Sequence, residues 1–173
     1  MSYEPTDLVR HAWRKPPRCV AAFVVEPLSA PESAWECWDE LAMLHLGCPC
    51  GSRQFRVLGF PHAEAGLLCP ITLECPACGA SALLFDIAVH GYDAELDGSC
   101  YSMRGEGAPQ PFSCSCSGVR FDVFASFSYQ IEPINDLDAD VIAHIEDFFD
   151  GFALPLRCVA CGKTQWASEY ECA

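Results

Sequence analysis

A chain of 173 residues, half of them hydrophobic and a fifth charged, can bury about 70% of its unfolded surface, which excludes a disordered protein. The net charge of −14 disfavours a grip on phosphate backbones. No charged and then apolar N-terminal segment is present, and the longest apolar runs are too short to cross a bilayer, so we expect a soluble, cytoplasmic protein. Thirteen cysteines in such a chain favour metal binding over disulfides.

The N-terminal segment, residues 1–18, is basic in an otherwise acidic chain. It holds four of the ten basic residues, whereas the rest of the chain has six basic and 22 acidic residues. One interpretation is an arm that docks an anionic partner through Trp13. The other is a terminal segment that lies across the acidic body, and we favour it because termini are commonly tied down without a binding role. The four basic residues are Arg10, Arg14, Lys15 and Arg18.

A strand and a helix are expected next. The β-branched run over 19–25, ended by Pro27, predicts the strand. Ser29 and Glu32 have the spacing of a helix capping box, and Gly47 is placed to end the helix. His45 then lies at the end of this helix, and we do not expect it to be a metal ligand. The helical face would carry Trp35, Trp38, Leu41, Ala42 and His45.

Two close pairs of cysteines follow, Cys48-Pro49-Cys50-Gly51 and Cys75-Pro76-Ala77-Cys78-Gly79. Four thiolates from two such pairs complete a tetrahedral site, and zinc is the expected metal. Iron remains the alternative, because a four-cysteine site accepts both metals. Alternating or apolar sequence predicts strands over 55–57, 67–73 and 83–89.

The same pattern returns as Cys114-Ser115-Cys116 and Cys158-Val159-Ala160-Cys161-Gly162. The first pairs are 66 positions apart and the second pairs 83, so the second copy is 17 residues longer. A strand over 121–131 and a helix over 138–149 are expected between its two pairs. The helix has about the size of the insertion, so a duplicated unit with an inserted helix accounts for both spacings. Phe55 and Phe121, like Val57 and Val123, also keep the spacing of 66.

With these motifs, 48–85 and 114–170 resemble zinc ribbons with rubredoxin-like knuckles, although one residue rather than two separates the cysteines of each first pair. The resemblance implies two knuckles that face each other on a small antiparallel sheet, and one structural zinc ion in each unit. The implied ligands are Cys48, Cys50, Cys75 and Cys78 in the first unit and Cys114, Cys116, Cys158 and Cys161 in the second.

The expected fold class is therefore α+β. It consists of two zinc-ribbon-like antiparallel β units related by duplication, with an N-terminal strand and helix and a helix inserted in the second unit. The expected division is an arm, strand and helix over 1–47, the first unit over 48–98, a glycine- and proline-rich linker over 99–113, and the second unit over 114–173.

Thiol redox chemistry is the rival interpretation of the cysteine pairs. A thioredoxin-like motif needs a helix after it to lower the thiol pKa, whereas strand-like sequence follows both pairs here. No phosphate loop, nucleophile elbow or His-Glu-x-x-His motif is present, so no catalytic residue is assigned. The remaining cysteines are expected to be packing residues, with Cys69 near enough to Cys75 to be a spare ligand. They are Cys19, Cys37, Cys69, Cys100 and Cys172.

Three functional hypotheses remain. The leading one is a non-enzymatic, zinc-stapled protein whose acidic surface engages another protein, for example as an inhibitor or antidote of a basic protein. The second is a nucleic-acid-associated ribbon that uses 10–18, Arg53 and Arg56. The third is an enzyme, thiol-redox or otherwise. The charge favours the first, because nucleic-acid affinity comes largely from Lys and Arg.

Overall fold

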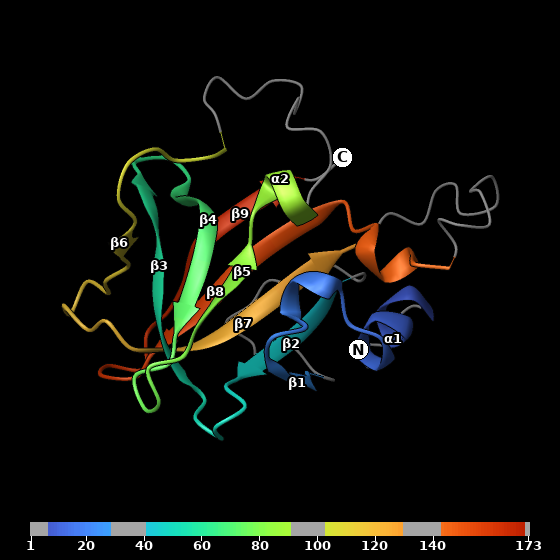
Figure 1. Cartoon of the computed structure of the whole chain (residues 1–173), viewed down its shortest axis with the longest axis horizontal. Coiled ribbons are helices and arrows are strands. Elements are labelled where there is room, and N and C mark those ends of the chain that lie inside the picture. Colours follow the sequence, from blue (N-terminus) through green and yellow to red (C-terminus); the bar gives the residue numbers. More distant parts are fainter. Residues whose placement is uncertain (1–6, 29–40, 91–102, 130–142, 172–173) are drawn as a thin grey trace.

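The computed structural model describes residues 7–28, 41–90, 103–129 and 143–171 (Figure 1). Among these residues no helix is long and apolar enough to span a bilayer. The elements, in chain order, are α1 (Asp7–Arg14), η1 (Arg18–Val20), β1 (Val24–Pro27), β2 (Leu41–Gly47), β3 (Gln54–His62), β4 (Gly66–Glu74), β5 (Ser81–Phe85), α2 (Ile87–His90), β6 (Gln110–Pro111), β7 (Phe121–Ser128), η3 (Ile145–Asp147), β8 (Gly151–Cys158) and β9 (Thr164–Glu171).

The described strands form one curled antiparallel sheet of nine strands (Figure 1). Its main path runs β1-β2-β7-β3-β4-β5, β8 lies on the other edge of β7 and is followed by β9, and β6 pairs with β3. The expected α+β fold of two small ribbon units with an inserted helix is therefore wrong. β2 and β3 of the first half both pair with β7 of the second half, so neither half has a sheet of its own.

Two strands share one edge of β7. β2 pairs with its C-terminal part, to His45 opposite Phe124, and β3 pairs with its N-terminal part, from Gln54 opposite Asp122. The chain advances nine positions from His45 to Gln54, while β7 covers two positions over the same distance. The excess of seven residues leaves the sheet as a loop. This loop carries the first cysteine pair.

The second half repeats this arrangement, with the roles of the two halves exchanged. β6 pairs with β3, with Pro111 opposite Leu58. Pro111 lies 66 positions after His45, and Leu58 lies 66 positions before Phe124. The strand that leads into each first cysteine pair therefore pairs with the long strand of the other half.

The β3–β4 and β7–β8 hairpins also have the same register when residues are matched at spacings of 66 and 83 positions. Val57 lies opposite Leu73 on β4, and their counterparts Val123 and Leu156 lie opposite each other in β7 and β8. The bulge between β4 and β5 recurs between β8 and β9 at the corresponding position. The repeat is thus present in the geometry of the sheet, while its origin by duplication stays a prediction.

The helix expected to end at Gly47 is wrong over the residues that the structure describes. Leu41–Gly47 is the strand β2, and the rest of that prediction, 29–40, lies outside the described residues. The side chains of β2 are buried on both faces, since Leu44 is in the main core and Met43 packs with Phe124 on the opposite face. A strand buried on both sides lacks polar alternation, so its sequence resembles that of a buried helix.

The inserted helix is wrong over its described part as well. Residues 143–149 contain only the short 3-10 turn η3, and 138–142 lie outside the described residues. The segment contacts the end of β7 and the residue after it: the Tyr129 hydroxyl donates to the carbonyl of Glu146, and the N–H of Asp150 donates to the carbonyl of Ser128. The apolar spacing instead places Phe149 in the core.

The strand predictions hold in part. Those over 55–57 and 67–73 are confirmed within β3 and β4, and 121–131 is confirmed as β7 as far as Ser128. The strand expected over 19–25 is replaced by η1 and the start of β1. The strand over 83–89 ends at Phe85, because the Asp86 carboxylate accepts the N–H of Ala88 and starts the turn of α2.

The core lies inside the curl and joins both halves of the chain. Phe85 of β5 stacks on Phe152 of β8 with ring centroids 4.1 Å apart, and on Tyr170 of β9 at 5.3 Å. The Tyr170 hydroxyl donates to the carbonyl of Leu67 on β4. The expected linker, as far as it is described, buries Met103 and contributes β6 to the sheet. The division of the chain into four parts stays a prediction.

Candidate metal centres

The first cysteine cluster joins two turns of the sheet. Cys48 and Cys50 lie in the loop between β2 and β3, and Cys75 and Cys78 lie in the turn between β4 and β5. Their four Sγ atoms all lie within 4.8 Å of one another. The Sγ atoms of Cys48 and Cys78 are 3.6 Å apart, as are those of Cys50 and Cys75.

The second cluster has the same construction. Cys114 and Cys116 precede β7, and Cys158 and Cys161 flank the turn between β8 and β9. The Sγ–Sγ distances are 3.7 Å from Cys114 to Cys161 and 3.6 Å from Cys116 to Cys158. Each half of the sequence repeat therefore closes its own cluster, as pairing in chain order predicts.

The geometry of both clusters fits a tetrahedral metal ion. Zinc–sulfur bonds of about 2.3 Å in a tetrahedron place the sulfurs about 3.8 Å apart. The four closest contacts, 3.6 to 3.7 Å, lie close to this value. They are too long for disulfides, whose bonds measure about 2.05 Å, and all ten described cysteines are free thiols. Two clusters of four cysteines that can hold metal ions are thus established, and zinc fits both.

All four turns are closed by a backbone hydrogen bond to the carbonyl of the first cysteine. In the first cluster the donors are the N–H groups of Gly51 and Gly79, at 2.9 and 2.8 Å. The residue that donates has a positive φ in every turn, which favours glycine. The φ values are 94° at Gly51, 74° at Gly79, 65° at Ser117 and 74° at Gly162.

One thiol of each cluster ionises readily. Burial raises the pKa of Cys75, but the backbone N–H groups of Cys78 and Ala77 and the neighbouring thiols outweigh burial and bring the pKa to about 6. The backbone N–H of Cys116, together with the other thiols of the second cluster, lowers the pKa of Cys114 to about 6. Backbone amides aimed at sulfur stabilise the thiolate that binds a metal.

A second thiol of each cluster resists ionisation. The backbone N–H of Cys50 lowers the pKa of Cys48, but burial and the neighbouring thiols raise it to about 12. The N–H of Gly118 likewise lowers the pKa of Cys116, while the three other thiols of its cluster raise it to about 12. Neighbouring negative charges less than 4 Å apart disfavour each other. A cation at the centre removes this penalty, so the donor set suits a divalent metal.

Each cluster has a buried and an exposed side. The first cysteine of every pair is buried, whereas the second, such as Cys50 or Cys161, is exposed. A metal ion would therefore lie at the surface of the sheet. Four cysteine ligands fill the tetrahedral coordination and leave no position for a reacting water, which is the pattern of a structural site.

The elements that follow the two Cys-x-x-Cys pairs test the interpretation of the cysteines as a thiol-redox site. β5 begins at Ser81, three residues after Cys78, and β9 begins at Thr164, three residues after Cys161. The first element after each Cys-x-x-Cys pair is thus a strand and not a helix. The helix N-terminus that lowers the pKa of a thioredoxin-like thiol is missing from both turns.

The other candidate residues lie outside the clusters. His45 accepts a hydrogen bond from Arg53 and stacks on Phe124, with ring centroids 4.6 Å apart, so it is not a ligand. Cys69 is fully buried, donates to the carbonyl of Met103 and accepts the N–H of Ile87, so it is no spare ligand. Cys19 is buried in the core as expected. The predictions for Cys37, Cys100 and Cys172 lie outside the described residues.

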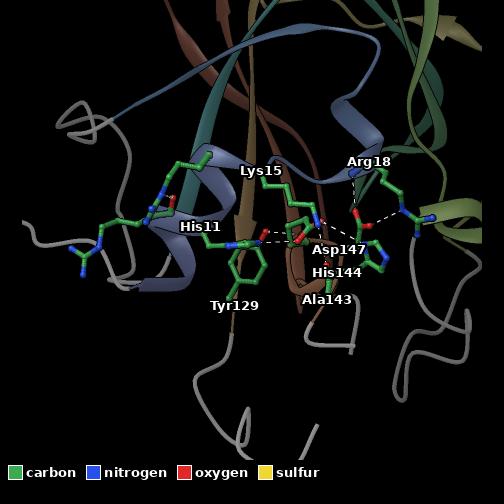
Figure 2. A network of polar contacts seen from close by, with 10 residues as sticks. His11, Lys15, Arg18, Tyr129, Ala143, His144 and Asp147 are labelled. Atoms are coloured by element: carbon green, nitrogen blue, oxygen red, sulfur yellow. Dashed lines mark hydrogen bonds and ion pairs between the residues drawn. The ribbon is translucent and has the colours of Figure 1, made fainter. Parts of the chain in front are cut away.

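A third group of possible ligands, His144, Glu146 and Asp147, was not predicted from the sequence. The protein's own cations occupy it (Figure 2). The Lys15 ammonium lies 2.6 Å from Oε1 of Glu146, and Nε of Arg18 lies 2.6 Å from Oδ2 of Asp147. We therefore interpret this group as an ion-pair network rather than a metal site.

This network fixes the N-terminal segment. His11 Nε2 lies 3.0 Å from Oε2 of Glu146, and Lys15 also donates to the carbonyl of Ala143. The contacts agree with a segment that lies across the body and not with a free arm. The partners are more than 120 positions apart, and no sequence pattern marks such a pairing.

No protein-family model, no curated protein and no solved structure matches this chain. The resemblance to zinc ribbons therefore rests on the chain's own features. These are the two cysteine clusters, the closed turns that present them and the three strands that surround each cluster.

Proposed function

We propose that this chain is a non-enzymatic zinc-binding protein with two structural four-cysteine sites and an acidic surface that engages another protein. The observation that carries the first part is the pair of closed clusters, with all four Sγ atoms in each within 4.8 Å of one another. When bound, zinc supplies the positive charge that holds four thiolates together.

The chain's own residues prepare each site. The closed turns fix the direction of the cysteines, and the backbone N–H groups of residues such as Ala77 and Cys116 favour the thiolate form. The first site joins the loop before β3 to the turn at the end of β4, the strand that pairs with β3. The second site joins the loop before β7 to the turn at the end of β8, the strand that pairs with β7. Zinc would therefore fasten the ends of strands that are far apart in sequence.

The acidic surface supports a protein partner of basic character. The chain has 24 acidic and ten basic residues, and at least five of the ten basic side chains form ion pairs with its own carboxylates: Lys15, Arg18, Arg53, Arg56 and Arg104. Internal pairing consumes equal numbers of both charges, so it leaves the excess of negative charge unchanged. Such a surface attracts a basic protein, and inhibition of that protein is one form this role would take.

The two alternatives have less support. A nucleic-acid-binding ribbon would use 10–18, Arg53 and Arg56, but Arg53 pairs with Glu26 and Arg56 with Glu74. Lys15 and Arg18 are engaged by Glu146 and Asp147. A thiol-redox enzyme of the thioredoxin type would have a helix directly after its cysteine pair, whereas a strand follows each Cys-x-x-Cys pair here.

Elemental analysis of the purified, reduced protein tests the metal assignment. We expect two zinc ions per chain and no visible absorption band. One ion, none, or the red colour of an iron–thiolate site would contradict the proposal. Because a mixture of metals can follow from expression conditions, the measurement is repeated after expression in medium enriched in zinc and in medium enriched in iron.

A further inference from the structure

We propose that the two metal centres are coupled, so that each binds its metal more tightly when the other is loaded. This inference rests on the proposed zinc sites and goes beyond them. Its basis is the exchange of leading strands between the two halves, which makes each cluster depend on strands that belong to the other.

The loop of the first cluster is anchored on the second half. β2 leads into Cys48 three residues after His45, and His45 lies opposite Phe124 on β7. β7 in turn begins after Cys116 and pairs along its length with β8, which ends at Cys158. The approach to Cys48 is therefore supported by the strand that lies between the two pairs of the second cluster.

The loop of the second cluster is anchored on the first half in the same way. β6 pairs with β3, and the pairing continues where the N–H of Phe112 donates to the carbonyl of Val57 at 2.8 Å. Phe112 lies two residues before Cys114. Val57 lies on the strand that begins after Cys50 and pairs with Leu73, two residues before Cys75.

A direct contact joins the two anchors. Phe55 of β3 lies opposite Phe121 of β7, and Phe121 lies opposite the ligand Cys158 on β8. Both rings are fully buried. The strand that follows the first pair of one cluster thus lies one strand away from a ligand of the other.

Coupling follows from the cost of ordering these shared strands. A metal bound at the first cluster fixes β3 and the end of β2, and these form the edge against which β7 must pack. The second metal then orders fewer residues on binding, so its affinity rises. The relation is reciprocal, and couplings of this kind commonly change affinity by about 5- to 150-fold.

The test uses cobalt(II) as a probe, because it takes tetrahedral thiolate sites and absorbs visible light. The reduced, metal-free full chain is titrated beside Cys78→Ser, which removes one ligand of the first cluster, and Cys161→Ser, which removes one of the second. We expect the intact cluster of each variant to bind cobalt at least about five-fold more weakly than the parent does, with similar factors in both variants. Equal affinity in parent and variants would overturn the coupling while leaving the two sites in place.

A second measurement needs no variant that could fail to fold. At half saturation, two independent and equal sites leave about half of the molecules with one metal ion. Native mass spectrometry of the half-loaded parent should show less of this one-metal species and more of the empty and doubly loaded forms. A one-metal population at or above the independent value would overturn the coupling. A parent that binds no metal would overturn the proposed function as well.

A third variant weakens the proposed connection without touching a ligand or the core. Gln110 is exposed and lies opposite Gly59 in the β6–β3 pair, so Gln110→Pro removes an N–H from this ladder. Gln110→Ala keeps the N–H and is the matched control. We expect Gln110→Pro to bind two cobalt ions with a larger one-metal population than Gln110→Ala. The same distribution in both variants would show that the exchanged strand does not carry the coupling.

Discussion

Phe55 and Phe121 lie opposite each other across β3 and β7 and are 66 positions apart, which is the spacing of the first cysteine pairs. Phe55 is therefore paired with its own counterpart in the sequence repeat. A local two-fold axis passes through this pair, and it relates the β2–β7 contact to the β6–β3 contact. Because both rings are buried, separating the two halves would expose them to water.

Loss of one ligand should remove one metal ion and much of the stability. Cys78→Ser and Cys161→Ser are each expected to hold one zinc ion and to melt on the order of 10 °C or more below the parent, since structural zinc contributes on the order of 10 kcal/mol to folding. Elemental analysis and thermal unfolding check both effects.

Cys100→Ser is the matched control for these variants, because Cys100 belongs to neither pair of cysteine motifs in the sequence. It should keep two zinc ions and the melting temperature of the parent. If Cys161→Ser melts like the parent, the second site is not structural.

Gly118→Ala should weaken the second metal site selectively. A Cβ at this position would lie 2.8 Å from Sγ of Cys158 and 3.3 Å from Sγ of Cys116, so the sulfurs must move. Changes to the groups that surround and orient metal ligands commonly cost about 10- to 100-fold in metal affinity. Competition with a chelator, followed by native mass spectrometry, would show one zinc ion lost early and the other retained.

The corresponding position of the first cluster supplies the control for that substitution. Ser52 lies 66 positions before Gly118 and already carries a Cβ. Ser52→Ala should therefore release both zinc ions at the same chelator concentration as the parent. Unchanged zinc retention in Gly118→Ala would contradict the tight packing around Cys158.

Glu146→Gln should flatten the loss of stability in acid. Burial raises the pKa of Glu146, but hydrogen bonds from Lys15 and His11 outweigh it and hold the pKa below the ordinary value of 4.5. The carboxylate therefore stabilises the fold fully above pH 4.5, and this stabilisation is lost as the pH falls through the lower folded value.

The variant lacks this contribution at neutral pH, where we expect it to be about 1 to 3 kcal/mol less stable. The difference from the parent should shrink as the pH falls below about 4.5. Urea unfolding over a pH series measures it. Glu106→Gln, which changes the net charge equally at an exposed position, should follow the parent. A constant difference at all pH values would contradict a role for the Glu146 charge.

The chain should not bind mixed-sequence DNA or RNA appreciably at physiological salt. A strong salt-dependent grip needs about six phosphate contacts, and at least five of the ten basic side chains are engaged by the protein's own carboxylates. A gel-shift assay tests this, and micromolar binding would support the nucleic-acid alternative. A basic protein should instead associate with the chain, and more slowly as salt rises.

The cysteine spacing correctly predicted which four cysteines form each cluster. A turn with two cysteines supplies half of a tetrahedral site, so a second such turn must supply the other half. The spacings of 66 and 83 also anticipated the common register of the hairpins. They did not predict that Pro111 lies opposite Leu58, since pairing between distant strands leaves no local periodicity. β2 was mistaken for a helix because it is buried on both faces.

The helix predicted over 138–149 is wrong over its described part, 143–149, for a different reason. The apolar spacing was real, but it places Phe149 in the core, and the described backbone forms only the 3-10 turn η3, in which the carbonyl of Glu146 accepts the Tyr129 hydroxyl. No role was assigned to Glu146 and Asp147 from the sequence. Only the fold brings Lys15 and Arg18 to them, so charge pairing over this distance was beyond sequence reasoning.

The shared edge of β7 has a consequence for synthesis. β2 and the start of β3 both pair with β7, which ends at Ser128. During synthesis from the N-terminus, the edge of β2 therefore stays unpaired while some eighty further residues are made. Such edges invite aggregation, and pairing over long sequence separations is slow. The four thiols of the first cluster are all made by Cys78, well before β7. Zinc captured at that stage would close the nascent hairpin, so metal supply during translation is expected to govern the yield of folded protein.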